Sequence, residues 1–184
     1  ILWIAMVVFM IPHLLAYMDD FHSGQLASKM QFYEPYKRWF PRNQTHLLLL
    51  WDKLGVPHSE DKQLFGPELV VIGFLVDSRR MRVTIPDEAR AAFLEELRRW
   101  MQKFKHGVWC SLREWQALAG YANCIFNVFP LLQPALCNIS AKMEGKEKVD
   151  ALIFIRETVR RDLMWLADHV RQSDGIFLIK TIDY

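Results

Sequence analysis

Two adjacent carboxylates, Asp19 and Asp20, follow an almost entirely apolar run in the segment LLAYMDDFHSG. Like charges on neighbouring residues repel each other, and taking either one out of water without a partner costs free energy. Mg²⁺ prefers such oxygen donors together with substrate phosphates, and two-metal phosphoryl transfer needs a cluster of carboxylates. The pair therefore indicates either a divalent-cation site or a solvated turn whose neighbours happen to be apolar.

The composition provides ample material for a folded core around such a site. The 184 residues are 52% hydrophobic and 13% aromatic, which excludes a disordered chain and suffices for one domain or two small ones. A net charge of +2 does not by itself indicate a nucleic-acid partner. The basic residues gather in four runs that are typical of solvated helix faces: 37–42, 79–82, 98–106 and 156–161.

The cysteines and the apolar N-terminal run indicate in which cellular compartment we expect the protein. Cys110, Cys124 and Cys137 are widely spaced and form no CxxC pair, so we expect reduced thiols in an intracellular protein of the cytoplasm or nucleus. The chain begins with Ile and has no basic region before its apolar run, so we expect a fragment of a longer chain rather than a signal peptide. A membrane span needs ~20 apolar residues, and Pro12 interrupts residues 1–18, which favours a buried helix over a span.

The elements that must position the carboxylates are predicted by the local patterns. Residues 14–18 predict a short buried strand and residues 21–26 its return strand, with Met18, Asp19 and Asp20 at the hairpin tip. Residues 33–42, with two prolines, predict an irregular surface segment. A helix follows from Asn43, as N-cap, to Gly55. Its inward side chains are predicted to be Leu47, Leu48, Trp51 and Leu54.

The rest of the chain changes from strands to helices near Pro86. The runs ELVVIGFLVD and MRVTIP predict the two strands of one hairpin. Helices are predicted over 87–106, 111–129, 131–142 and 155–174, the second opened by Ser111 and Glu114 at capping-box spacing, and a strand starts at Ile176. The predicted inward residues of the first and last of these helices are Phe93, Leu97, Trp100 and Phe104, and Val159, Leu163, Leu166 and Val170. This is an α+β arrangement.

The order of these elements behind YMDD resembles the reverse transcriptases, which are RNA-directed DNA polymerases. Residues 17–20 are similar to the YxDD signature of that family, and a helix, a Lys-containing loop, a primer-grip hairpin and a helical thumb follow in the family's order. The run WQALAGYANCIFNVFPLLQPAL resembles a thumb-helix pattern of the family. The phrases GFLVDSRRMRVTIPDEAR and SLREWQALAGYAN are most similar to retrotransposon enzymes, including tyrosine-recombinase-associated (DIRS-like) and fungal elements.

The resemblance implies a division into three parts and an activity. Residues 1–86 correspond to a partial palm, 87–145 to the thumb, and 146–184 to a connection helix and a truncated strand. The parent protein would extend a primer 3′-hydroxyl with deoxynucleoside triphosphates on an RNA or DNA template, using two Mg²⁺ ions or alternatively Mn²⁺. Its partners would be the template–primer duplex and the nucleotide, with no membrane, and an RNase H domain often follows in such elements.

The resemblance also assigns roles to residues near the carboxylates. Asp19 and Asp20 match the palm carboxylates that coordinate the catalytic metal ions, and Tyr17 and Met18 match positions beside the primer terminus. Lys62 matches the loop lysine that protonates the pyrophosphate leaving group. An ordinary exposed lysine is the alternative for Lys62.

Further roles fall on the second hairpin and the thumb. Ile72, Gly73 and Phe74 match the primer grip, and the alternative is a packed hairpin with a glycine bulge. Gln116 and Gly120, four residues apart on one helix face, match the surface that follows the duplex minor groove. The alternative for Gly120 is a contact that allows two helices to pack closely.

Two departures from the family pattern limit these roles. Cys124 stands where retroviral enzymes have an aromatic residue, which weakens the expected tracking of the minor groove. In the family, a third palm carboxylate and the fingers precede the YxDD hairpin. The 184 residues do not include them, so we expect the fragment to be inactive alone. The other hypothesis is a decayed or repurposed element-derived protein that keeps the fold and binds nucleic acid without catalysis.

Overall fold

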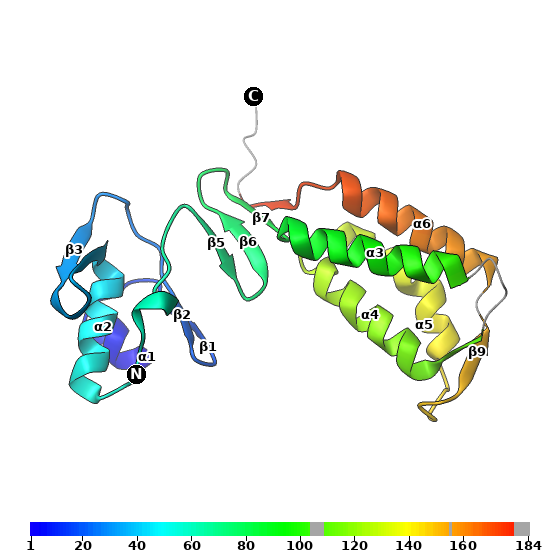
Figure 1. Cartoon of the computed structure of the whole chain (residues 1–184), viewed down its shortest axis with the longest axis horizontal. Helices are drawn as coiled ribbons and strands as arrows, with labels where there is room; N and C mark the ends of the chain where they lie inside the picture. The colour runs from blue at the N-terminus through cyan, green and yellow to red at the C-terminus, as the bar shows by residue number, and fades with distance from the viewer. Residues whose placement is uncertain (104–108, 155, 179–184) are drawn as a thin grey trace. The chain divides into compact units, whose positions relative to one another are not determined.

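The computed structural model describes residues 1–103, 109–154 and 156–178, and its secondary structure is mixed α+β as predicted (Figure 1). The chain divides into two compact units, Ile1–Gly66 and Pro67–Tyr184. Among the described residues, no helix combines the length and the apolar character needed to cross a bilayer.

The first unit is built around helix α2. Its elements are α1 (Leu2–Val7), β1 (Leu15–Tyr17), β2 (Asp20–His22), β3 (Met30–Tyr33), β4 (Arg38–Pro41), α2 (Arg42–Leu54) and two 3₁₀ turns, Glu34–Tyr36 and Glu60–Lys62. One side of α2 packs Leu47 and Leu50 with Ile11, while Leu48 packs with a second cluster that contains Tyr33 and Phe40. The helix thus holds both hairpins of this unit, β1–β2 and β3–β4.

The N-terminal run is less buried than its composition predicts. Helix α1 has only six residues and buries one of them, Ala5, while Trp3 is 67% exposed. The prediction of a buried strand at residues 14–18 is wrong, because all three residues of β1 are exposed and only the preceding Leu14 enters the core. Apolar composition alone does not say whether another layer covers a segment.

Two further predictions in this unit are corrected. Residues 33–42 are not irregular, because β3 and β4 pair in register from Met30–Pro41 to Tyr33–Arg38. The two prolines are compatible with this hairpin, since Pro35 lies in the 3₁₀ turn and Pro41 lies at the end of β4. Asn43 is not the N-cap: α2 begins at Arg42, and the Asn43 backbone N–H donates to Gln25 Oε1 at 2.8 Å. The side chain of Gln25, in the preceding loop, therefore accepts a hydrogen bond from a backbone N–H at the start of α2, as an N-cap side chain would.

The end of α2 and its inward face are predicted with partial success. Gly55 ends the helix with a left-handed φ of 66°, as expected of a C-terminal glycine. Leu47 and Leu48 are buried, Trp51 is half-buried, and Leu54 is exposed. Leu50 is buried instead, because the β1–β2 and β3–β4 hairpins cover two different sides of the helix.

A polar network ties α2 to the β3–β4 hairpin and to the loop that follows. The Tyr33 hydroxyl donates to Asp52 Oδ2 at 2.7 Å, His58 Nε2 lies 3.1 Å from Asp52 Oδ1, and the Tyr36 hydroxyl lies 2.6 Å from His58 Nδ1. Burial and the neighbouring Asp52 carboxylate raise the pKa of Tyr33 well above its ordinary value. The folded state therefore favours the neutral phenol.

This raised pKa predicts a loss of stability at alkaline pH. The stabilisation is present below about pH 10, the ordinary pKa of tyrosine, and is lost as the pH rises further, because the unfolded chain then releases the proton first. In Tyr33→Phe we expect unfolding free energy to be lower by about 1 kcal/mol at neutral pH and to fall less steeply above about pH 10. Urea unfolding at several pH values measures both effects, with Tyr17→Phe at an exposed site as the control. Identical pH dependence of Tyr33→Phe and the wild type would contradict the prediction.

The second unit combines a small antiparallel sheet with a helical core. Its elements are β5 (Glu68–Val71), β6 (Phe74–Asp77), β7 (Arg82–Thr84), α3 (Asp87–Lys103), β8 (Trp109–Ser111), α4 (Leu112–Phe126), a 3₁₀ helix (Pro130–Leu136), α5 (Cys137–Met143), β9 (Leu152–Phe154), α6 (Glu157–Gln172) and β10 (Ile176–Phe177). The sheet order is β10-β7-β6-β5, and β8 pairs with β9 separately. The run 68–77 is therefore two strands, β5 and β6, and not the single strand predicted.

The amphipathic faces of the two longest helices are as predicted. Phe93, Leu97 and Trp100 of α3 are buried, while Phe104 and the predicted stop at Gly107 lie outside the described residues. The four predicted residues of α6 are all fully buried: Val159, Leu163, Leu166 and Val170. The helix predicted over 131–142 is a 3₁₀ helix followed by α5, since Pro134 removes a backbone donor.

The compact units do not divide where the sequence pattern changes. The boundary falls after Gly66, and Ile85, with Phe74 and Val83 packed beside it, joins the core of the helices. The C-terminal strand β10 returns to pair with β7, and Arg90 donates to the carbonyls of Val170 and Ser173 at 2.7 and 2.6 Å. Residues 87–145 and the part beyond them thus share one core, while their division into thumb and connection stays a prediction.

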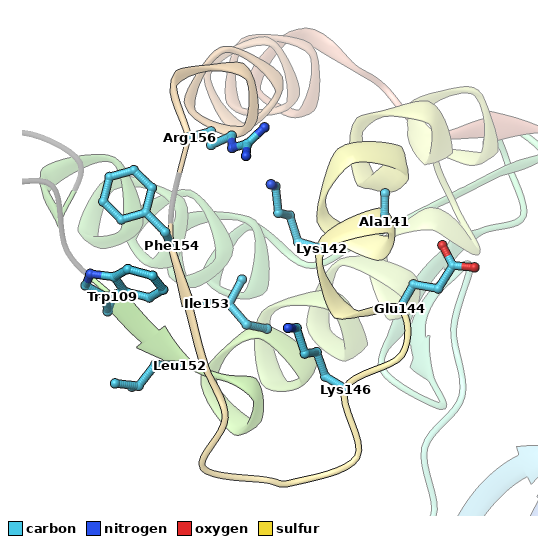
Figure 2. Close-up of a pocket in the computed structure, with 9 residues that line it drawn as sticks. All are labelled: Trp109, Ala141, Lys142, Glu144, Lys146, Leu152, Ile153, Phe154 and Arg156. Carbon is cyan, nitrogen blue, oxygen red and sulfur yellow. The ribbon is translucent and has the colours of Figure 1, made fainter.

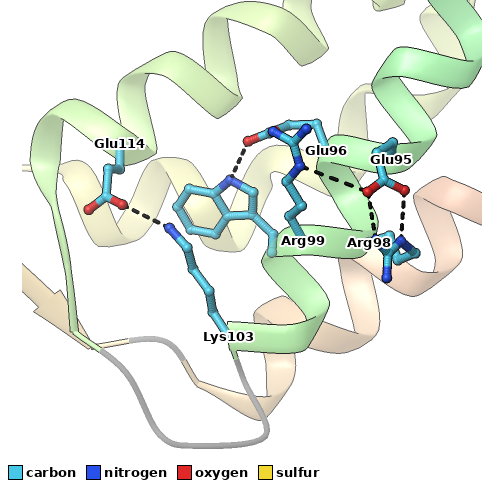
Figure 3. A network of polar contacts seen from close by, with 7 residues as sticks. Glu95, Glu96, Arg98, Arg99, Lys103 and Glu114 are labelled. Atoms are coloured by element: carbon cyan, nitrogen blue, oxygen red, sulfur yellow. Dashed lines mark hydrogen bonds and ion pairs between the residues drawn. The ribbon is translucent and has the colours of Figure 1, made fainter.

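Helix α4 begins with the predicted capping box. The Ser111 hydroxyl accepts from the Glu114 backbone N–H, and Glu114 accepts from the Ser111 backbone N–H at 2.9 Å. Lys103 at the end of α3 donates to the same carboxylate at 2.8 Å and holds the pKa of Glu114 below its usual range (Figure 3). On α3 itself, Arg98 and Arg99 pair with acids one turn earlier, as expected of a solvated basic run.

Removing this cap should lower stability measurably. We expect Ser111→Ala to reduce the unfolding free energy by about 1 kcal/mol, because one N-terminal backbone donor of α4 loses its partner. Ser140→Ala, at an exposed position within α5, is the matched control and should show no such loss. Urea unfolding followed by circular dichroism measures both variants, and equal stability of the two would contradict the role of the cap.

Candidate carboxylate site and nucleic-acid interface

The YMDD residues form the tight turn of a hairpin and the strand pair that closes it. Strands β1 and β2 are antiparallel, and Tyr17 pairs with Asp20, so Met18 and Asp19 form the two-residue turn. Asp20 is thus the first residue of β2, and not part of the tip as predicted. Met18 has a φ of 54° and is 87% exposed. Both aspartates are exposed.

The hairpin is held in place by apolar contacts on the strand side. Leu14, immediately before β1, is buried in the cluster that contains Leu47 and Leu50 of α2. Phe21 of β2 packs edge-on against Trp51 with ring centroids 5.5 Å apart. The two aspartates therefore stand on a hairpin whose base is fixed against a helix of the same unit.

The carboxylate oxygens of the pair are of the donor type that divalent cations prefer. Within the described residues, neither aspartate forms an ion pair with Lys or Arg, so their oxygens are not engaged by a protein cation. Hard oxygen donors suit Mg²⁺, which is usually held by one or two carboxylates together with phosphates and waters. The described residues bring no third His, Cys, Asp or Glu to this pair.

Lys62 lies in the same unit as the pair. It is the last residue of the 3₁₀ turn Glu60–Lys62 and is exposed. No hydrogen bond or ion pair between described residues joins it to Asp19 or Asp20. Nearby, Glu60 pairs with Arg38 at 3.7 Å, which helps to hold this loop against β4. The structure thus leaves both interpretations of Lys62 open.

The predicted primer-grip residues form another two-residue turn. Val71 pairs with Phe74, leaving Ile72 and Gly73 as the turn, with φ values of 50° and 81°. Two positive φ angles are typical of a type I′ hairpin, which explains Gly73 by its backbone conformation and replaces the glycine bulge of the alternative interpretation. Phe74 packs against the helical core, whereas Ile72 is 49% exposed. Of the three residues, Ile72 and Gly73 are the ones available to a ligand.

Gln116 and Gly120 lie on the exposed side of α4. The buried side consists of larger residues, among them Trp115, Leu118 and Ile125. A Cβ atom placed on Gly120 would meet nothing within 4 Å. The alternative that Gly120 permits close helix packing is therefore wrong, since none of the described residues lies within 4 Å of that Cβ position. An exposed mid-helix glycine costs about 1 kcal/mol relative to alanine without any compensating contact in the described residues.

The exposed face of α4 contains more than the two predicted residues. Seven positions share it at spacings of three and four: Arg113, Gln116, Ala117, Gly120, Asn123, Cys124 and Asn127. Arg113 was missed by the sequence analysis, although its distance of three residues from Gln116 places both on one side of a helix. This face, called the α4 face below, presents one guanidinium group and three side-chain amides beside the small residues Ala117 and Gly120.

The chain was compared with protein-family models, with curated proteins and with solved structures, and none of them matches it. The resemblance to reverse transcriptases therefore rests on the residues quoted above.

Proposed function

We propose that this chain is part of an RNA-directed DNA polymerase that extends a primer 3′-hydroxyl with deoxynucleotides. The observation that carries the proposal is the exposure of Asp19, in the turn, and Asp20, at the start of β2, on a hairpin whose base is anchored on α2. Fixed carboxylates of this kind suit a reaction in which charge develops on transferring phosphate oxygens.

Each residue has one task in the proposed reaction. Asp19 and Asp20 would hold Mg²⁺, which when bound supplies charge neutralisation for the phosphates. The primer 3′-hydroxyl would release its proton to solvent as its oxygen bonds to the α-phosphorus, and the bond from that phosphorus to the bridging oxygen would break. Lys62 would donate a proton to the departing pyrophosphate. Tyr17 and Met18 would contact the primer terminus.

The second unit would bind the duplex in this proposal. The turn at Ile72 and Gly73, with Phe74 behind it, would hold the primer strand. On the α4 face, Gln116 offers a side-chain amide to minor-groove acceptors, and Gly120 permits close approach of a sugar–phosphate backbone. Arg113 adds a phosphate contact that carries affinity without sequence preference.

Primer extension tests the proposal. The gene product that contains these 184 residues is incubated with an RNA template, a labelled DNA primer and the four deoxynucleoside triphosphates. We expect primer elongation that requires Mg²⁺ or Mn²⁺ and stops on addition of a chelator. Absence of elongation on both RNA and DNA templates, by a protein that is folded, would contradict polymerase activity.

A second candidate function is binding of nucleic acid without catalysis. It is favoured by the α4 face, where no contact among the described residues explains why a glycine stands at position 120. Arg113 and Gln116 on the same face can bind a duplex without a metal ion. Duplex binding without elongation by the same gene product would select this candidate over the polymerase.

A further inference from the structure

The described residues around the hollow of about 610 Å³ beside β9 lie on two sides of that strand. Lys142 and Lys146 enter the space between α5 and β9, whereas the rings of Trp109 and Phe154 lie on the other side of the β8–β9 pair (Figure 2). A ligand held by the lysines would therefore not reach the rings. A cluster with closer and better defined contacts lies in the first unit, around His58.

Residues 56–66, called the Lys62 loop below, follow α2 and contain the 3₁₀ turn Glu60–Lys62. All of them are exposed or half-buried, so burial of apolar side chains contributes little to holding the loop. The ion pair between Glu60 and Arg38 is half-exposed on both sides and contributes only a small part. Hydrogen bonds to the rest of the unit are therefore the main restraint on the position of the turn.

His58 makes the most complete of these contacts. Its side chain is 10% exposed, and both ring nitrogens have a partner outside the loop: Nε2 lies 3.1 Å from Asp52 Oδ1, and Nδ1 lies 2.6 Å from the Tyr36 hydroxyl. An ionised carboxylate can only accept, so Nε2 carries the proton, and in the neutral ring Nδ1 accepts from Tyr36. These partners, which belong to α2 and to the β3–β4 hairpin, fix one tautomer and one orientation of the ring.

The fixed ring is connected to the turn that carries Lys62. Gln63 Nε2 donates to the carbonyl of Ser59 at 3.1 Å, and Ser59 directly follows His58. The same Gln63 side chain accepts from Gln44 of α2 through its Oε1 at 3.2 Å. Lys62 directly precedes Gln63, so its backbone lies between two points that hydrogen bonds attach to the rest of the unit.

We propose that His58 is a positioning residue for Lys62: it holds the loop in the place from which the lysine acts, and it does not touch the nucleotide or the primer. This inference rests on the proposed function, in which Lys62 protonates the departing pyrophosphate. A general acid has to lie within hydrogen-bond reach of the oxygen that it protonates, and a displacement of about 1 Å can cost on the order of a hundredfold in rate.

Trypsin cleavage of the 184-residue chain tests whether His58 holds the loop. Cleavage after Lys62 requires the turn to open locally. We expect His58→Ala to raise this cleavage rate on the order of tenfold, while cleavage after Arg79, in the exposed turn between β6 and β7, stays unchanged as the internal reference. His46→Ala removes a half-buried imidazole of α2 and is the matched control, with wild-type cleavage at both sites.

Circular dichroism establishes that each variant is folded. Tyr36→Phe removes a single hydroxyl from the network and replaces His58→Ala in the test if the alanine variant does not fold. Because it removes one hydrogen bond and leaves the bond between His58 and Asp52, it should raise cleavage after Lys62 by a smaller factor, about threefold.

Nucleotide incorporation by the gene product that contains the chain tests whether the position of the loop matters for Lys62. In His58→Ala we expect kcat to fall on the order of tenfold and the KM for the nucleotide to stay within about twofold, because Lys62 acts on charge that develops only in the transition state. His58→Gln retains an N–H donor for Asp52 and should recover part of the rate. In a Lys62→Gln background, His58→Ala should cause less than about a twofold further loss, because both substitutions remove the same contribution.

Three results would overturn the inference and leave the proposed function intact. The first is wild-type cleavage after Lys62 in His58→Ala, which would show that other contacts hold the loop. The second is wild-type kcat in His58→Ala. The third is a loss of rate in His58→Ala that persists in full in the Lys62→Gln background, which would show that the two residues act separately. A folded wild-type gene product that elongates no primer would overturn the proposed function and this inference with it, and is distinguished from the other results because the wild type is then itself inactive.

Discussion

Primer extension should fall on the order of a thousandfold when either Asp19 or Asp20 is replaced by asparagine. Asparagine has the same shape but no charge, and a carboxylate that holds Mg²⁺ at the transferring phosphate contributes several kcal/mol to the transition state. Both residues are exposed, so the same substitutions should change the unfolding free energy by no more than about 0.5 kcal/mol. Single-turnover extension in Mg²⁺ measures the effect in the gene product that contains the chain.

Asp174→Asn is the matched control, since Asp174 is an exposed aspartate outside the hairpin. It should retain full activity. Duplex affinity of the Asp19 and Asp20 variants should stay within about twofold of wild type, because the α4 face is unchanged. Wild-type extension rates in both aspartate variants would contradict the metal-binding role of the pair and therefore the polymerase proposal.

Substitution of Gly120 should change stability and duplex affinity in opposite directions. In Gly120→Ala and Gly120→Gln we expect the unfolding free energy to rise by about 0.5 to 1 kcal/mol, because glycine is a poor helix former and an added Cβ atom meets no described residue within 4 Å. Duplex affinity should fall on the order of tenfold in Gly120→Gln, and less in Gly120→Ala, because a longer side chain keeps the backbone of the duplex at a distance.

Urea unfolding and duplex anisotropy measure the two effects in the same protein samples. Ala92→Gln adds a comparable side chain at an exposed position of α3 and should leave duplex affinity unchanged. A stabilised Gly120→Gln with wild-type duplex affinity would show that the α4 face does not bind nucleic acid. Opposite changes in stability and affinity are the signature of a residue kept for function rather than for folding.

The local features of this protein follow from its sequence with little error. The capping box at Ser111, the glycine that ends α2 and the buried stripes of α3 and α6 were all predicted correctly. Each depends on residues within about one or two helical turns, where spacing alone decides which side chains meet. The α+β class follows from the same local periods.

The errors arise where a distant partner decides the outcome. Residues 30–41 form a hairpin because Tyr33 and Phe40 pack with Leu48 of α2, a contact that is not evident from the two prolines in the segment. Asn43 is not a cap because Gln25, from an earlier loop, reaches the same end of the helix. Trp109 and Phe154 are 45 residues apart in the chain and were not connected by any sequence pattern.

For the candidate site, the sequence by itself determined the residue types: two adjacent carboxylates on a short hairpin, and a Gln and a Gly four residues apart on one helix. Only the tertiary structure decided their surroundings. It left the aspartates exposed and unpaired within the described residues, explained Gly73 by its backbone conformation, and placed no neighbour against Gly120. The physical reason is that residue type and spacing are local, whereas burial depends on which other elements pack against a face.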